Sequence, residues 1–280
     1  MSKKQRIRSI VLFVLIAAAL LAGIFLTGDT HSEGESIQEV MQDAVLHESA
    51  KISFFGLKEV NPAVISAFAV TGIFLVFALI VRIFVIPRFK EVPGKFQLLL
   101  EQGVGIFDSL AKTNSPHKNK FLGGYVFTAG AYIFVGTLFE LFGVQAITTT
   151  GASVSLPAPL ADINGAIGMG VFSYLVIMSG AVSEHGIKGV GKALKDFSLP
   201  ISMSFRLFGA LLSGALVTEL VYHYLSLSFV LPIFVGVMFT LLHALIQAYV
   251  LTMLTALFYG EMSEPEQKKP PKTKKSKKKA

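Results

Sequence analysis

One arginine lies inside a stretch of sequence that is otherwise apolar enough to enter a membrane. It is Arg206, within SFRLFGALLSGALVTEL at residues 204–220. A buried arginine costs at least about 2.5 kcal/mol on insertion scales, so it requires a partner or a path to water. The small residues between Gly209 and Ala215 would let another helix approach closely, which suits a moving partner. Snorkelling of the long side chain to the membrane surface is the simpler alternative.

Two pairs of polar residues are spaced four apart in the last two apolar segments. Glu219 and His223 form one pair, and His243 and Gln247 form the other. Residues four apart are neighbours on a helix surface, so each pair shares a face. A carboxylate beside an imidazole can pass a proton near neutral pH. These residues are therefore candidates for proton transfer inside a membrane.

Three more polar residues lie at the external ends of apolar segments. Glu140 lies near the external end of the third segment, and Asp162 and Asn164 open the fourth. Asp162 also has a structural interpretation, because aspartate is a preferred N-cap residue of helices.

The rest of the sequence shows no signature of a soluble enzyme. GIKGVGKALKD at residues 186–196 lacks the spacing of a phosphate-binding loop. SEHG at residues 183–186 has no second histidine at ligand spacing, and the chain contains no cysteine. We therefore expect no catalytic residues, no cofactor and no metal site.

Composition places the candidate residues in a polytopic membrane protein. Of the 280 residues, 52% are hydrophobic and 15% are charged, which is too little charge to cover a soluble domain of this size. Six apolar segments each approach the roughly 20 residues that a bilayer crossing needs. They are Ile10–Leu26, Asn61–Ile86, Phe121–Val144, Ile163–Val182, Leu199–Leu225 and Ser228–Tyr259. We expect an all-α fold with five core transmembrane helices, and a sixth if the first segment is retained rather than cleaved as a signal peptide.

Basic residues fall on one side of the membrane if all six segments cross. They lie between segments two and three, between four and five, and after six, whereas loops 148–162 and 226–228 contain no Lys or Arg. The positive-inside rule therefore makes the C-terminus cytoplasmic. The net charge of +7 reflects a tail near anionic lipid or solvent, and we expect no nucleic-acid partner. The predicted division is 1–29 (N-terminal hydrophobic segment), 30–60 (external polar segment), 61–264 (transmembrane domain) and 265–280 (disordered Lys-rich tail).

The sixth segment is too long for a straight crossing. No charged residue occurs from Tyr224 to Gly260, and a helix of that length spans roughly 55 Å, against a hydrocarbon core of about 30 Å. It must tilt strongly or break near Pro232. The short turn SLS makes it an antiparallel hairpin with the fifth segment, which predicts that Arg206 and Gln247 stand at similar depth on facing helices.

Five stretches resemble subunit a of the F-type ATP synthase, the membrane stator that faces the rotating c-ring. RLFGALLSGALVTEL is similar to the family pattern R-L-F-G-N-M-x-[AS]-G-[EH]-L, and four other stretches follow the order of the family. These are EVPGKFQLLLEQGVGIFDSL (91–110), PLADINGAIGMGVFSYL (159–175), LPISMSFRLFG (199–209) and LIQAYVLTMLTALFYGEMSE (245–264). The resemblance covers roughly residues 60–264 and implies a strongly tilted final hairpin.

The resemblance also implies roles for individual residues. Arg206 matches the arginine that faces the c-ring carboxylate, and Gln247 matches a glutamine of the last helix. Asp162 and Asn164 match the A-D-[IV]-N motif of the family.

The sequence departs from the family pattern at three positions. Ala210 replaces the usual Asn, Ala215 stands where Glu or His is common, and Thr240 stands where the last helix often carries His or Glu. Counting from the turn puts Ala215 and Thr240 near each other. We hypothesise that Glu219 and His243, each one turn away from these positions, take over part of the proton path, with Glu140 as a further addition at the external end.

The resemblance implies a proton-translocating stator subunit that is not itself catalytic. It would offer two half-channels to the c-ring carboxylates, with the ion, H⁺ or Na⁺, selected by the c subunit. Implied partners are the c-ring, a peripheral stalk of subunit b or b/b′, the rest of the synthase, and the lipid of a bacterial-type inner membrane. A stand-alone ion channel or secondary transporter is the alternative, and it predicts inverted repeats that the sequence does not show. A passive assembly anchor would need neither Arg206 nor Glu219.

Overall fold

The structure is a computed structural model that describes residues 52–54, 57–117, 119–147, 153–223 and 231–265, with single positions between 11 and 22. The first apolar segment, most of the external polar segment and the Lys-rich tail therefore lie almost wholly outside the described residues. The long helices are α3 (Pro62–Ile80), α4 (Lys95–Asn114), α5 (Lys120–Phe139), α6 (Ile163–His185), α8 (Ser198–His223) and α10 (Leu231–Met262), with the short α7 (Ile187–Ala193) before α8.

Five helical spans in the described part of the chain are long and apolar enough to cross a membrane. They are Pro62–Arg88, Lys120–Phe142, Ile163–His185, Ser198–Thr218 and Val235–Met262. This confirms the predicted all-α class with five core transmembrane helices. Two short antiparallel hairpins, which the sequence did not predict, add to it: β1 (Ile52–Phe54) with β2 (Leu57–Val60), and β3 (Gln145–Ile147) with β4 (Ser153–Ser155).

Helix α3 has a capped start and an irregular end. The side chain of Asn61 accepts a hydrogen bond from the Ala63 N–H at 2.9 Å and so caps the first turn. At the other end the α-helix gives way to a wider turn and then a 3₁₀ turn over residues 81–88. Pro87 accounts for this change, because proline lacks an N–H and clashes with the carbonyl four residues earlier.

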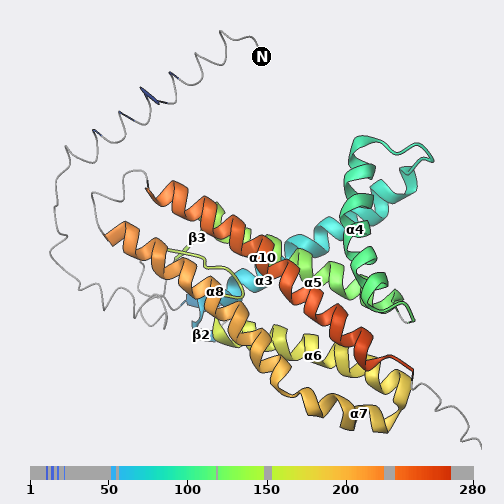
Figure 1. Cartoon of the computed structure of the whole chain (residues 1–280). Helices are drawn as coiled ribbons and strands as arrows, with labels where there is room; N and C mark the ends of the chain where they lie inside the picture. Colours follow the sequence, from blue (N-terminus) through green and yellow to red (C-terminus); the bar gives the residue numbers. More distant parts are fainter. Residues whose placement is uncertain are drawn as a thin grey trace, which may run out of the picture.

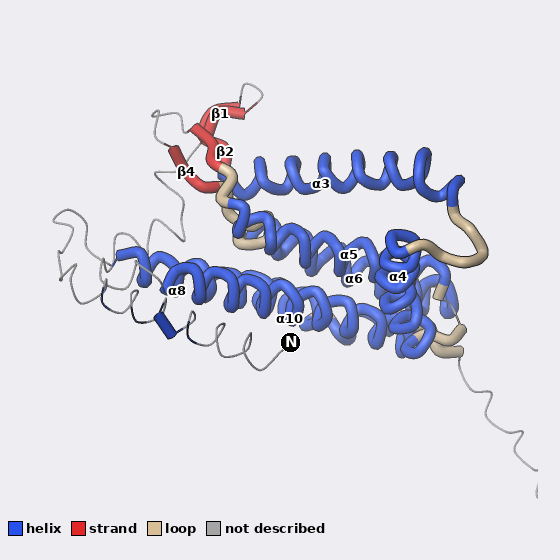
Figure 2. The backbone as a smooth tube through the Cα atoms, turned by 90° about the horizontal axis from the view of Figure 1, so that it is seen from above, coloured by secondary structure: helices blue, strands red, loops and turns tan. Residues whose placement is uncertain are grey.

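Helix α4 runs across the bundle rather than along it. Figure 1 shows it at a steep angle to α10, and Figure 2 shows it end-on while α3, α5 and α10 lie lengthwise. It lies at the end of the bundle where the basic loops gather, since α5 starts there with Lys120. The stretch from 91 to 110 therefore provides a helix that crosses the end of the bundle next to the basic loops.

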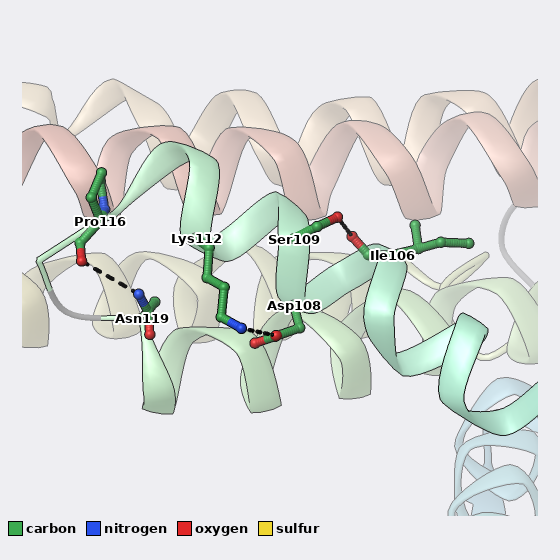
Figure 3. A network of polar contacts seen from close by, with 6 residues as sticks. All are labelled: Ile106, Asp108, Ser109, Lys112, Pro116 and Asn119. Atoms are coloured by element: carbon green, nitrogen blue, oxygen red, sulfur yellow. Dashed lines mark hydrogen bonds and ion pairs between the residues drawn. The ribbon is translucent and has the colours of Figure 1, made fainter. Parts of the chain in front are cut away.

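Short-range polar contacts close the turn from α4 into α5, as Figure 3 shows. Asp108 and Lys112 form an ion pair at 2.6 Å between residues four apart. The Asn119 amide donates to the Pro116 carbonyl at 3.4 Å. Both residues of the ion pair are exposed to solvent, and exposed pairs contribute at most about 1 kcal/mol. The ion pair thus lies within α4 and adds little to the stability of the fold, and the Asn119 bond lies in the turn itself.

Helices α8 and α10 lie side by side and antiparallel, in both Figure 1 and Figure 2. The predicted turn between them, residues 224–230, lies outside the described residues. Pro232 falls in the first turn of α10, where proline is tolerated, and the helix continues unbroken for 32 residues. The predicted break near Pro232 is therefore the point where the helix begins. At 1.5 Å per residue α10 is about 48 Å long.

The core lies between α5, α6, α8 and α10, where glycines bring helices close together. A Cβ on Gly180 of α6 would lie 2.7 Å from the ring of Tyr259 of α10. A Cβ on Gly170 of α6 would overlap the hydroxyl of Ser204 of α8. Small residues at such crossings provide close van der Waals packing, which helps hold membrane helices together in the absence of a hydrophobic driving force.

Gly260 offers a test of this packing. A Cβ there would overlap the carbonyl oxygen of Asn114 at the end of α4. We expect Gly260→Val to lower the amount of subunit in the membrane severalfold, because overpacking costs about 1–3 kcal/mol. Immunoblotting of washed membranes measures this. In Gly191→Val, the control, a Cβ meets nothing within 4 Å, and an equal loss in both variants would contradict the packing argument.

Candidate functional site

Arg206 lies on the exposed face of α8. Ser202, Gly209 and Ser213 share this face and are exposed as well. Within the described residues, no hydrogen bond or ion pair involves Arg206. A Cβ on Gly209 would meet no atom within 4 Å. The guanidinium therefore lies on a small-residue surface that is open to another molecule.

Gln247 is buried, in contrast to Arg206. Its side chain is only 5% exposed, and its Oε1 is buried without a hydrogen-bond partner among the described residues. Gly214 and His243 face each other, since a Cβ on Gly214 would lie 3.4 Å from His243 Nδ1. Continuing this antiparallel register one turn puts Gln247 opposite Ala210, one turn from Arg206. The two polar groups are thus close in depth, but one is exposed and the other is buried.

A small cavity between α5, α8 and α10 collects polar groups toward the external end. Its empty volume of about 200 Å³ includes space that is open to the outside, and the enclosed space is about the size of one water molecule. The lining side chains are Thr137, Glu140, Leu211, Gly214, Ala215, Thr240 and His243. The structure thus puts Ala215 and Thr240 around one cavity, and it brings Glu140 and His243 to that same cavity from α5 and α10.

Thr137 is a cavity residue that the sequence reasoning missed. It is 2% exposed and its hydroxyl donates to the Ile133 carbonyl at 2.7 Å. The available signal was its position three residues before Glu140, which puts both side chains on one face of α5. Glu140 follows the last residue of α5, in a 3₁₀ turn over Glu140–Phe142, and is half-buried.

Asp162 lies apart from this cavity and serves as the N-cap of α6. Its Oδ1 accepts from the N–H groups of Asn164 at 2.9 Å and Gly165 at 3.2 Å. Its Oδ2 accepts from the side-chain amide of Asn61 at 2.8 Å. The side chain of Asn164 is exposed. The predicted N-cap of α6 by Asp162 is therefore present, and its role in proton transfer stays a prediction.

The side chains of Glu219 and His223 lie outside the described residues. Their backbone belongs to the last turns of α8, which continues to His223. From Ala215 at the cavity, Glu219 is one helical turn further toward the external end, and His223 is two turns further.

The fold and the site define a polytopic α-helical membrane protein with ionisable groups placed within and beside its spanning helices. A family model described as ATP synthase A chain matches residues 64–260, well over half of the 280 residues. The chain belongs to the ATP synthase A chain family.

Individual relatives agree with the family match. An ATP synthase subunit a 2 of Vibrio campbellii is 25% identical over 213 residues, which is 66% of this chain and 82% of that protein. An ATP synthase subunit a of Actinobacillus pleuropneumoniae is 26% identical over 227 residues, or 67% and 86% of the two chains. One from Pasteurella multocida is 28% identical over 198 residues, or 60% and 75%.

The family match confirms the predicted resemblance. It decides between the two classes that the sequence left open, in favour of an ATP synthase subunit over a stand-alone channel or secondary transporter. The chain is the proton-conducting membrane subunit of the ATP synthase and not a catalytic subunit.

Proposed function

We propose that this chain carries protons to and from the carboxylates of a c-ring that turns against the face of α8 containing Arg206. The main observation behind this proposal is that Arg206 is exposed among small residues and has no ion-pair partner within the described residues. A membrane arginine needs a counter-charge, and a ring carboxylate supplies one. Small residues at Gly209 and Ser213 leave room for a close approach.

Protons reach the ring from the external side through the cavity between α5, α8 and α10. Glu140 and Thr137 line it from α5, and His243 lines it from α10. A carboxylate and an imidazole around one water-sized space can exchange protons near neutral pH. Ala215 and Thr240 border the same space, so His243 and Glu140 supply titratable groups at the cavity where these two positions have none. Glu219 and His223 extend the path outward along α8.

The charges of the ring carboxylate and of Arg206 then explain how proton flow is coupled to rotation of the ring. A protonated ring carboxylate is neutral and can turn into lipid, where its charged form is costly. On the cytoplasmic side it loses the proton, and Arg206 attracts the resulting anion. The fixed positive charge also repels a proton that would pass directly between the two half-channels. Arginine suits this role because it keeps its charge in a low dielectric, where a buried lysine can lose its own. Gln247, one turn away, borders the inner side of the same region.

The complex and the membrane complete the proposal. The neighbours of this chain are the c-ring, a peripheral stalk of subunit b or b/b′, and lipid of a bacterial-type inner membrane, with the C-terminus cytoplasmic. The transmembrane domain is residues 61–264. The N-terminal segment 1–29, the external segment 30–60 and the Lys-rich tail 265–280 flank it. Co-purification with a small carboxylate-bearing hairpin subunit would distinguish this assembly from a passive anchor.

Replacement of the cavity residues tests the external path. We expect Glu140→Gln and His243→Leu each to lower ATP-driven proton pumping by about tenfold or more, since a positioned acid or base contributes at least that much to proton transfer. Dye quenching in inverted membrane vesicles measures pumping, normalised to the amount of assembled complex. Glu219→Gln tests the outward extension in the same way.

The matched control is Glu184→Gln, which removes an exposed carboxylate at the opposite end of α6. It should leave pumping near the unaltered level. Full pumping in the double variant Glu140→Gln/His243→Leu would show that protons take another route.

A further inference from the structure

Two helix caps that lie far apart in the sequence are joined by one hydrogen bond. The Asn61 amide donates to Asp162 Oδ2 at 2.8 Å, across 101 residues. Asn61 uses its Oδ1 to cap α3 at the Ala63 N–H. Asp162 uses its Oδ1 to cap α6 at the N–H groups of Asn164 and Gly165. Each side chain thus caps its own helix with one atom and holds the other helix with its second.

We propose that Asn61 and Asp162 form a polar latch that fixes the external end of α3 to α6, and that Asp162 is a positioning residue and not a proton carrier. The part of this inference that is tested by proton pumping rests on the proposed function, whereas the part that concerns the position of α3 does not. It revises the expectation that Asp162 belongs to the proton path.

A latch at the external end matters for helix α3 because its packing against the bundle is confined to its first half. Its buried residues are Pro62, Ala63, Ser66 and Val70, all in its first nine positions. From Thr71 to Ile80 every residue except Phe74 is exposed. Figure 2 shows α3 running apart from the remaining bundle along most of its length. In lipid, apolar side chains alone provide no driving force for helix association, so an interhelical hydrogen bond matters more.

The other half of the latch belongs to a rigid part of the fold. Leu156, Ala158 and Leu160 precede Asp162 and are at most 5% exposed. A Cβ on Gly165 would lie 2.7 Å from the Pro159 carbonyl, so the loop folds tightly onto the start of α6. Because this loop is rigid, a hydrogen bond from it fixes the position of the start of α3.

A second contact continues the attachment of α3 below the latch. Val70 packs in a small cluster with Ile52, Phe139 and Leu156. The rings of Phe74 and Tyr132 lie 6.3 Å apart, centre to centre. The latch thus closes the external end of an interface that runs for three turns along α3 and then stops.

The two residue types are matched, which makes the latch testable by exchange. In Asp162→Asn, the new side chain must cap α6 through its amide oxygen. Its NH₂ group then faces the NH₂ group of Asn61, and no hydrogen bond forms between them. In Asn61→Asp, two carboxylates face each other. The exchange Asn61→Asp/Asp162→Asn restores every hydrogen bond, because each side chain again has an oxygen for its own cap and the pair again has one donor and one acceptor.

The position of α3 can be measured directly, because the chain has no cysteine. Cysteines at Phe74 and Tyr132, treated with a short bifunctional thiol reagent, report the distance between α3 and α5 in membranes containing the whole complex. We expect each single variant to lower the crosslink yield by about threefold or more, since a hydrogen bond to a charged group is lost. We expect the exchange to restore it, with Ser155→Ala, at an exposed residue of the preceding strand, as the neighbouring control that changes nothing.

Proton pumping by dye quenching, measured without the cysteines, separates the two roles of Asp162. Recovery of pumping in the exchange variant supports positioning, because the carboxylate then belongs to position 61 on the α3 side and position 162 can no longer take up a proton. A restored crosslink without restored pumping would show that the Asp162 carboxylate itself carries protons, and would overturn the proposal. An unchanged crosslink in both single variants would remove the latch, while leaving the Arg206 assignment intact.

Discussion

Arg206→Ala is expected to abolish ATP-driven proton pumping and ATP synthesis while the subunit still assembles. Arg206 is exposed and has no partner within the described residues, so the substitution leaves no internal charge uncompensated. What is lost is the counter-charge for an ionised ring carboxylate. An unpaired carboxylate in the bilayer costs at least about 2.5 kcal/mol, which corresponds to a rate reduced by about 70-fold. Dye quenching and ATP synthesis in inverted vesicles measure the effect.

Further variants test whether the loss of activity in Arg206→Ala is due to the loss of the positive charge. Arg206→Lys should keep part of the activity, because lysine supplies a positive charge but can lose it when desolvated. Passive proton flow through vesicles stripped of the catalytic sector should rise in Arg206→Ala if the charge also blocks direct passage. Arg82→Ala, which removes an exposed arginine at the inner end of α3, is the control. Normal coupled synthesis in Arg206→Ala would refute the role given to this residue.

Gly209→Leu should stop coupling by bulk alone, without disturbing the chain itself. A Cβ at this position meets no atom of the chain within 4 Å, and Gly209 lies one turn from Arg206 on the same exposed face. If a ring helix passes there, a leucine obstructs it. Overpacking costs about 1–3 kcal/mol, so we expect pumping to fall by about tenfold or more at unchanged levels of subunit in the membrane.

Gly168→Leu is the matched control for this experiment. Gly168 is also an exposed helical glycine with no atom within 4 Å of an added Cβ, but it belongs to α6. Pumping should remain near normal there. If Gly209→Leu also pumps normally, the face of α8 next to Arg206 is not the surface that meets the ring.

The sequence predicted the spanning helices because their signal is local. Long apolar stretches separated by basic or neutral loops define five spans, and the structure has helices at all five. The length argument for the last segment reduced its geometry to two alternatives. Pro232 resolved them by starting α10, since a proline in the first turn has no intrahelical hydrogen bond to lose.

Features that depend on distant contacts were not predictable in the same way. The bond between Asn61 and Asp162 joins residues 101 apart, and no spacing rule connects them. The role of Thr137 depends on which face of α5 meets α8 and α10. The burial of Gln247 depends on the rotation of α10 about its axis, which a helix apolar on all faces does not encode.

The length of α10 has a consequence for where protons arrive and leave. From Leu231 to Gly260 it has no charged side chain, so about 45 Å of uncharged helix meets a hydrocarbon layer about 30 Å thick. A helix longer than the layer tilts, and tilting displaces its two ends from each other in the plane of the membrane. A proton entrance beside one end of α10 and a proton exit beside the other end therefore do not lie above one another along the membrane normal. A proton that has come in by the first can leave by the second only after it has been moved sideways, and in the proposed function a turning ring of carriers makes that movement.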